Sequence, residues 1–192
     1  MRKKIIAVIG DGKIERNGEE YRLAHETGKA LIDAGYRIQT GGLGGVMEAV
    51  FTGARESPNY KEGDTVALVP SFDREQANQY ADIVIPTGLD VMRNSLVANA
   101  DAVIAVGGGA GTLSEMAMAW ALFRLILAYS NTGGWSAELA GRRIDGRIRY
   151  PEIPEDRVYA VTGPEECTKL LEKYIDRYTR SHTGIKNRRD GI

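Results

Sequence analysis

The residues best suited to chemistry lie in one stretch, the segment DAVIAVGGGAGTLSE from Asp101 to Glu115. A run of β-branched and small apolar residues predicts a buried strand, and a glycine-rich stretch follows it directly before a helical pattern. Glycine lets a backbone approach phosphate oxygens closely, and the free N–H groups at the start of a helix attract anions. The spacing therefore predicts a phosphate-binding loop formed by Gly107, Gly108, Gly109, Ala110, Gly111 and Thr112.

Two further glycine clusters follow predicted strands in the same way. Gly10 and Gly12 come after the apolar run at 5–9, and a cluster at 41–45 comes after the run at 37–40. Because the carboxyl ends of parallel strands face one edge of a sheet, we expect the three loops to converge on one ligand site. The additional candidate ligand-binding residues are Gly10, Asp11, Gly41 and Gly42, and the Asp11 carboxylate could contact a ribose hydroxyl or stabilise its own turn.

The sequence excludes the two best-known nucleotide-binding patterns and gives no metal site. The G-x-G-x-x-G fingerprint fails because Glu15 stands at its third position, and no G-x-x-x-x-G-K-[ST] motif occurs. A classical NAD enzyme and a P-loop NTPase are therefore not expected. The two histidines, His25 and His182, lie in a predicted helix and in the C-terminal tail, so neither a metal site nor a catalytic triad can be assembled from them.

The glycine loop has a more specific resemblance. Together with the upstream stretches TGGLGGVMEAV and TGLDVMRNSLVANADAVIAV, GGGAGTLSE resembles the LOG-like family, long labelled as lysine decarboxylases. That family includes cytokinin-activating phosphoribohydrolases and molybdenum cofactor carrier proteins. The resemblance covers roughly residues 4–175 and matches the family motif P-G-G-x-G-T-x-x-E, except that Gly107 replaces its proline. The stretch MRNSLVANAD is more similar to the carrier-like branch than to the plant-type hydrolases.

The resemblance implies a phosphorylated small-molecule ligand, either a nucleotide or another ribosyl or cofactor phosphate, held by the loop. In hydrolase members an arginine and the motif glutamate are catalytic, and the matching residues here are Arg93 and Glu115. The expected activity is hydrolysis of the N-glycosidic bond of a nucleoside 5′-monophosphate, with no required cofactor. The alternative is a non-catalytic molybdenum cofactor carrier. Lysine decarboxylation is not expected, because no lysine for pyridoxal phosphate lies between Lys61 and Lys169.

Both candidate catalytic residues also have a purely structural interpretation. Thr112 and Glu115 have the spacing of a capping box, in which Thr112 would be the N-cap and Glu115 would reach back to its N–H. Arg93 lies near a predicted helix start, where an arginine commonly faces solvent. The sequence leaves these alternatives open.

Short apolar runs alternate with helical patterns along the chain, which is typical of an α/β fold. We predict a single-domain, Rossmann-like, doubly wound and mostly parallel sheet of about six to seven strands, with helices on both faces. For residues 123–129 we favour a strand over an extension of the preceding helix. The predicted strands are 5–9, 37–40, 65–69, 82–85, 102–106, one within 123–129 and 158–161, and the predicted helices are 19–34, one from 46, 91–99, 113–122 and 164–178.

Length and charge limit the remaining possibilities. The 192 residues suit one domain over 1–180, followed by a polar, basic tail at 181–192 that we expect to be disordered. The balance of 25 basic against 26 acidic side chains argues against nucleic acid as a partner. A single cysteine, Cys167, and a short N-terminal apolar run predict a cytoplasmic protein without a membrane partner. The family resemblance implies a homo-oligomer, a dimer or larger.

Overall fold

The computed structural model of the chain describes residues 2–182, so residues 183–192 of the expected tail lie outside the described residues. Seven strands form one sheet in the order β4-β3-β2-β1-β5-β6-β7, and all neighbouring strands are parallel. The chain therefore reverses its winding direction between β1 and β5, which creates a crevice at their carboxyl ends. The strands are β1 (Ile5–Gly10), β2 (Arg37–Thr40), β3 (Thr65–Val69), β4 (Ile83–Pro86), β5 (Ala102–Val106), β6 (Leu125–Tyr129) and β7 (Val158–Val161).

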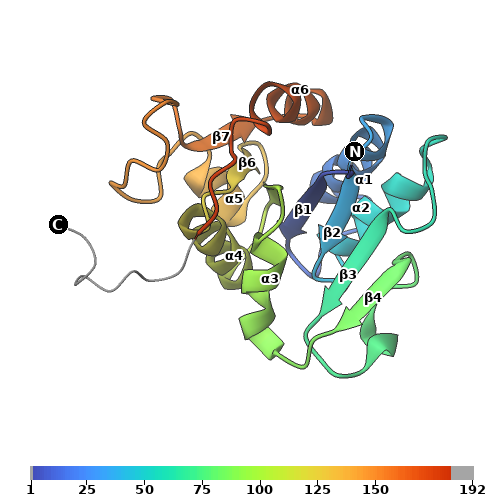
Figure 1. The fold of residues 1–192 in the computed structure, drawn as a ribbon. Coiled ribbons are helices and arrows are strands. Elements are labelled where there is room, and N and C mark those ends of the chain that lie inside the picture. Colours follow the sequence, from blue (N-terminus) through green and yellow to red (C-terminus); the bar gives the residue numbers. More distant parts are fainter. Residues whose placement is uncertain (1, 183–192) are drawn as a thin grey trace.

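Helices cover both faces of this sheet (Figure 1). One apolar cluster joins the sheet to α1, α2 and α6, and a second cluster on the other face joins it to α3, α4 and the end of α5. The predicted doubly wound α/β fold is thus confirmed. The helices are α1 (Glu19–Asp33), α2 (Val46–Arg55), α3 (Asn94–Ala98), α4 (Ala110–Ala121), α5 (Gly134–Leu139) and α6 (Pro164–Tyr174), with short 3-10 helices η1 (Arg74–Gln76) and η2 (Asp90–Arg93).

The strand predicted after residue 123 is confirmed as β6. The chain leaves α4 at Phe123, which has a φ of 64°, and the N–H of Arg124 bonds back to the carbonyl of Ala119. This left-handed residue ends the helix before the apolar run at 125–129, and each residue of β6 is buried. Helix propensity alone does not reveal such a reversal.

Three helix predictions need correction. The helix expected over 91–99 is divided into η2 and the five-residue α3, which begins at Asn94. The helix expected from residue 113 begins at Ala110, and α6 ends at Tyr174 rather than at residue 178. The sequence interpretation also missed α5, a short helix in the glycine- and serine-containing stretch after β6.

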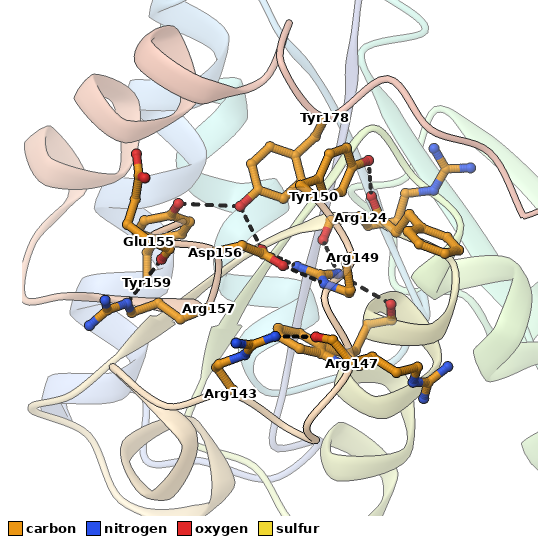
Figure 2. Close-up of polar contacts among 12 residues, drawn as sticks. Arg124, Arg143, Arg147, Arg149, Tyr150, Glu155, Asp156, Arg157, Tyr159 and Tyr178 are labelled. Atoms are coloured by element: carbon orange, nitrogen blue, oxygen red, sulfur yellow. Dashed lines mark hydrogen bonds and ion pairs between the residues drawn. The ribbon is translucent and has the colours of Figure 1, made fainter. Parts of the chain in front are cut away.

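A buried polar cluster attaches the C-terminal segment to the core (Figure 2). The guanidinium of Arg149 forms two hydrogen bonds with the Asp156 carboxylate, at 2.6 and 3.0 Å, and lies 3.7 Å from the centre of the Trp120 ring. The hydroxyl of Tyr178 donates to the same carboxylate at 2.7 Å. Through these contacts the segment after α6 is fastened to α4, one of the helices that form the site. No helix in residues 2–182 is both long and apolar enough to cross a membrane.

Candidate functional site

A cleft of about 210 Å³ opens where the carboxyl ends of β1, β2 and β5 meet. The three glycine loops contribute to its wall, together with η2 and the start of α3 and α4. The sequence interpretation placed Gly12 in a loop at the site without naming it as a ligand-binding residue, and it missed three further lining residues, Ile9, Met47 and Asn94. The lining residues are Ile9, Gly10, Asp11, Gly12, Gly41, Met47, Arg93, Asn94, Gly109, Gly111, Thr112 and Glu115.

The glycine-rich loop after β5 is held from behind by its neighbours. The N–H groups of Trp135 and Ser136, at the start of α5, donate to the carbonyls of Gly108 and Gly107 at 2.9 and 3.1 Å. The loop's own N–H of Gly107 donates to the Thr132 hydroxyl at 3.0 Å. These protein contacts hold the loop in its conformation.

The first turn of α4 presents free donors to the cleft. The intrahelical bonds begin with the N–H of Leu113, which donates to the carbonyl of Gly109 at 3.0 Å. The N–H groups of Ala110, Gly111 and Thr112 have no hydrogen-bond acceptor within residues 2–182. Unsatisfied N–H groups at a helix N-terminus, with the helix dipole behind them, favour an anion such as phosphate.

Two glycines of this loop have no packing reason to be glycine. A Cβ added to Gly109 or Gly111 would meet no protein atom within 4 Å, and neither residue has a positive φ. Gly108 differs, because its φ is +101° and an added Cβ would lie 2.2 Å from the Thr112 hydroxyl oxygen. The bare surface at Gly109 and Gly111 is thus open to the cleft, where it would allow a ligand to approach the backbone.

The capping box, the structural alternative for Thr112 and Glu115, is absent. Gly109 is the N-cap of α4, no side chain caps this helix, and Thr112 lies inside its first turn. Since the helix begins three residues before the predicted start, the side chain of Glu115 is one full turn inside it and is buried rather than at the helix end. This leaves Glu115 free to interact across the cleft.

Across the cleft, Arg93 of η2 lies opposite Glu115 of α4. The distance from Arg93 Nη1 to Glu115 Oε1 is 3.4 Å, and the two side chains are only 10% and 9% exposed. The structural alternative, a solvent-facing arginine, therefore does not apply to Arg93. Its guanidinium lies directly on Gly41, where an added Cβ would be 2.3 Å from Nη1, and its Nε is buried without a hydrogen-bond partner.

Burial perturbs the protonation of both groups. It raises the pKa of the Glu115 carboxyl to about 7, although the positive charge of Arg93 opposes this rise. Burial also lowers the pKa of Arg93, which the Glu115 carboxylate opposes in turn. A carboxyl that titrates near neutrality inside a cleft is characteristic of functional sites.

Asn94 fixes the relative position of η2 and α4. Its amide donates to the Ser114 hydroxyl at 2.8 Å, and that hydroxyl donates to the carbonyl of Gly111 at 2.7 Å. These bonds join the residue next to Arg93 to the first turn of α4. No sequence pattern pointed to Asn94, because its partners are 20 residues away along the chain.

Asp11 and Gly42 have structural contacts that the sequence did not suggest. The Asp11 carboxylate accepts from the N–H of Gly108 at 3.1 Å, and its carbonyl accepts from the N–H of Val46 at 2.9 Å. Asp11 therefore connects the three loops. Gly42, with a φ of +78°, lies outside the cleft, and its carbonyl accepts from Asn78. Gly107, Gly108 and Ala110 also do not line the cleft.

The fold and this cleft define a Rossmann-like α/β protein with a glycine-lined cleft at the point where the sheet reverses its winding. Residues 3–155 match the SLOG cluster4 family, and the chain belongs to that family. The expected family relationship is thus confirmed. Residues 2–182 contain no group of three or more His, Cys, Asp or Glu side chains placed to hold a metal ion.

Several known proteins are similar to this chain. An uncharacterized protein from Archaeoglobus fulgidus is 42% identical over 115 residues, which is 59% of this chain and 72% of that protein. The structure is similar to the molybdenum cofactor binding protein of the phototrophic bacterium Rippkaea orientalis, with 30% identity, a TM-score of 0.74, and coverage of 91% of this chain and 99% of that one.

Two more distant structures share the fold alone. The molybdenum cofactor carrier protein of Chlamydomonas reinhardtii is 24% identical, with a TM-score of 0.71 over 91% of this chain and 99% of that one. DNA processing protein A of Helicobacter pylori, described by its single-stranded DNA binding mode, is 17% identical, with a TM-score of 0.64 over 88% of this chain and 80% of that one.

Proposed function

We propose that this protein binds a phosphorylated small molecule in the cleft and acts as a carrier for a pterin phosphate of the molybdenum cofactor type. The observation that carries the proposal is the first turn of α4, whose free N–H groups lie beside two glycines that leave open space. A phosphate monoester fits this position, since the N–H groups and the helix dipole match its charge. The similarity to the Rippkaea orientalis protein supports a cofactor as the phosphorylated ligand.

Arg93 is suited to hold a second part of the same ligand. It is buried, it lines the cleft, and the Glu115 carboxylate is its one hydrogen-bond partner within residues 2–182, so a ligand oxygen or ring nitrogen can accept from its remaining terminal N–H groups. The protein residues would thus hold the organic part of the cofactor. The metal of the cofactor is cargo in this proposal.

The carrier proposal is tested with molybdenum cofactor released from a purified molybdoenzyme. The protein is incubated with it, separated by gel filtration, and analysed for pterin by fluorescence after oxidation. We expect the wild-type protein to retain pterin. The Gly111→Ala variant should retain much less, because the new methyl group would stand in the ligand's space. Gly146→Ala, also at an uncrowded position but outside the cleft, is the matched control. Absence of pterin in the wild-type fraction would contradict the proposal.

The pair of Glu115 and Arg93 favours a second candidate function, hydrolysis of a nucleoside 5′-monophosphate to its free base. A carboxylate next to the sugar would stabilise an oxocarbenium-like transition state and orient water, while Arg93 would hold the phosphate or ribose end. A panel of nucleoside 5′-monophosphates followed by chromatography would detect released base. If the wild type releases no base from any of these nucleotides, and Glu115→Ala gives the same chromatogram as the wild type, hydrolysis is not the function.

A further inference from the structure

A second cavity, which we call the β6 cavity, lies beside the glycine-rich loop and apart from the cleft. It has a volume of about 360 Å³ and is formed by the segment after β1, the start of α1 and the turn after β6. Small-molecule sites typically measure about 300–1,000 Å³, a range that includes this cavity but not the cleft of about 210 Å³. The β6 cavity is therefore large enough to hold a ring system of its own.

The glycine-rich loop lies between the cleft and the β6 cavity. Gly109 lines the cleft, whereas Gly107, two residues earlier, contacts two residues that line the β6 cavity. The N–H of Gly107 donates to the Thr132 hydroxyl at 3.0 Å, and a Cβ added to Gly107 would be 2.7 Å from Glu20 Oε1. Since two residues of chain span at most about 7 Å, one ligand can reach both spaces.

The two spaces lie on either side of the point where the sheet reverses its winding. That point is between β1 and β5. The cleft includes residues from the end of β1 and the loop after β2, whereas the β6 cavity includes residues from the segments after β1 and β6. In open α/β sheets a dinucleotide binds across this crevice. The arrangement therefore suits a ligand with two ring systems joined through phosphates.

Glu20 provides the β6 cavity with a free hydrogen-bond acceptor. Its neighbour Glu19 is paired with Arg22 at 2.6 Å, whereas the Glu20 carboxylate forms no hydrogen bond or ion pair within residues 2–182. An ionised carboxylate only accepts hydrogen bonds, so it is complementary to a ring that presents two neighbouring N–H donors. Guanine has such an edge, formed by its N1–H and 2-amino groups. The matching edges of adenine and cytosine each place an acceptor nitrogen beside the amino group.

Gly107 leaves room for this carboxylate. Its φ is +61°, which proline cannot adopt, and any Cβ at this position would displace the Glu20 side chain. The motif of the LOG-like family has proline at the position of Gly107. This chain therefore departs from the motif at the residue that allows Glu20 to stand beside the loop.

We propose that the β6 cavity binds the guanine base of a guanosine nucleotide whose diphosphate lies at the start of α4. The Glu20 carboxylate accepts from the N1–H and 2-amino groups of the base, and the free N–H groups of Ala110, Gly111 and Thr112 bind the diphosphate. This extension rests on the proposed function. The cargo is then a pterin phosphate joined through a pyrophosphate to guanosine, with the pterin in the cleft and the guanine in the β6 cavity.

The test measures the binding of GDP, ADP and CDP to the full chain by isothermal titration calorimetry. We expect GDP to bind at least tenfold more tightly than the other two, because only guanine offers both donors to Glu20. Glu20→Gln should lose this preference, since an amide has one acceptor oxygen and places a donor beside it. Glu19→Gln removes the same charge from the same cavity, but from a carboxylate already paired with Arg22, so this matched control should keep the preference.

A second variant fills the β6 cavity without changing Glu20. Gly133 lines the cavity with a φ of −78°, and the one protein atom near an added Cβ is Glu20 Oε1, at 3.8 Å. The position therefore accepts a side chain that extends into the cavity. Gly133→Leu should weaken GDP binding at least tenfold while keeping the wild-type circular dichroism spectrum and the wild-type affinity for pyrophosphate.

Three results would overturn the proposal: equal or absent binding of the three nucleotides by the wild type, a preference that persists in Glu20→Gln or disappears in Glu19→Gln, or wild-type GDP affinity in Gly133→Leu. None of them bears on whether pterin is retained in the carrier test. A wild type that retains no pterin but prefers GDP in the way described would contradict the carrier function and support the guanine site.

Discussion

At the scale of single residues, the site depends on a buried pair of opposite charges that share one cleft. Arg93 and Glu115 are 3.4 Å apart, and burial keeps the Glu115 carboxyl near its protonation midpoint at neutral pH. Each group lowers the cost of burying the other, so a ligand that approaches Arg93 also changes the environment of Glu115. The pair can therefore assist binding in a carrier and proton transfer in a hydrolase.

The raised pKa of Glu115 predicts a pH dependence of stability. Because the folded state holds the proton more tightly than the unfolded chain, this contribution is fully present below pH 4.5 and is lost as the pH rises through about 7. Between pH 5 and pH 8, the free energy of unfolding of the wild type should fall by about 1–3 kcal/mol relative to Glu115→Gln. Urea unfolding at both pH values measures this change. Parallel pH profiles for the two proteins would contradict it.

At the scale of elements, the start of α4 and the start of α2 use glycine for opposite reasons. Gly111 leaves open space in the cleft, whereas Gly45, the N-cap of α2, has a φ of +66° and touches the backbone of Asp11. The first glycine is available to a ligand, and the second holds two loops together. Substitutions at these positions should therefore separate binding from stability.

Gly45→Ala should destabilise the protein by about 2 kcal/mol or more, because the added Cβ would lie 2.1 Å from the Asp11 carbonyl oxygen and the left-handed conformation would be strained. Gly111→Ala should leave the stability unchanged or raise it by up to about 1 kcal/mol, since alanine favours the helix and meets no atom. Thermal unfolding of both variants at one pH provides the comparison. Similar losses in the two variants would show that Gly111 is also required for packing.

At the scale of the whole molecule, the sheet positions the three loops of the cleft. The polar cluster around Arg149 fastens the C-terminal segment to the body of the protein (Figure 2). The side chains of Arg149 and Asp156 are only 1% and 4% exposed, and each is hydrogen-bonded. A buried ion pair of this kind adds little to the free energy of unfolding compared with an apolar pair of similar size. Removing one partner is costly, however, because it leaves the other charge buried without compensation.

Arg149→Ala should therefore cost about 3–5 kcal/mol, because the Asp156 carboxylate would remain buried without its partner. Arg147→Ala is the matched control, since Arg147 pairs with Asp145 at the surface and its loss should cost about 1 kcal/mol or less. Chemical denaturation measures both values. A loss for Arg149→Ala no larger than that of the control would mean that the cluster does not hold the C-terminal segment.

The fold was predictable because short apolar runs in the sequence correspond to buried strands in the structure. Strands β2, β3, β5 and β7 have the predicted bounds. Strands β3, β5 and β7 are short, mostly apolar runs, whereas β2 was placed by the glycines at both of its ends. The site was harder to predict from the sequence. The proposed phosphate loop was visible in the glycine spacing, but the start of α4 was misplaced because the sequence alone did not distinguish Thr112 from Gly109 as the N-cap.

The sequence by itself determined the parallel α/β fold, the family and the three glycine loops, because local hydrophobic and glycine patterns specify them. Only the tertiary structure decided that Arg93 turns inward to Glu115, that Asp11 bonds to Gly108, and that β4 keeps an apolar face exposed. These features depend on contacts between residues far apart in the chain and on which surfaces remain uncovered. Local sequence patterns specify neither the long-range contacts nor the surfaces that stay uncovered.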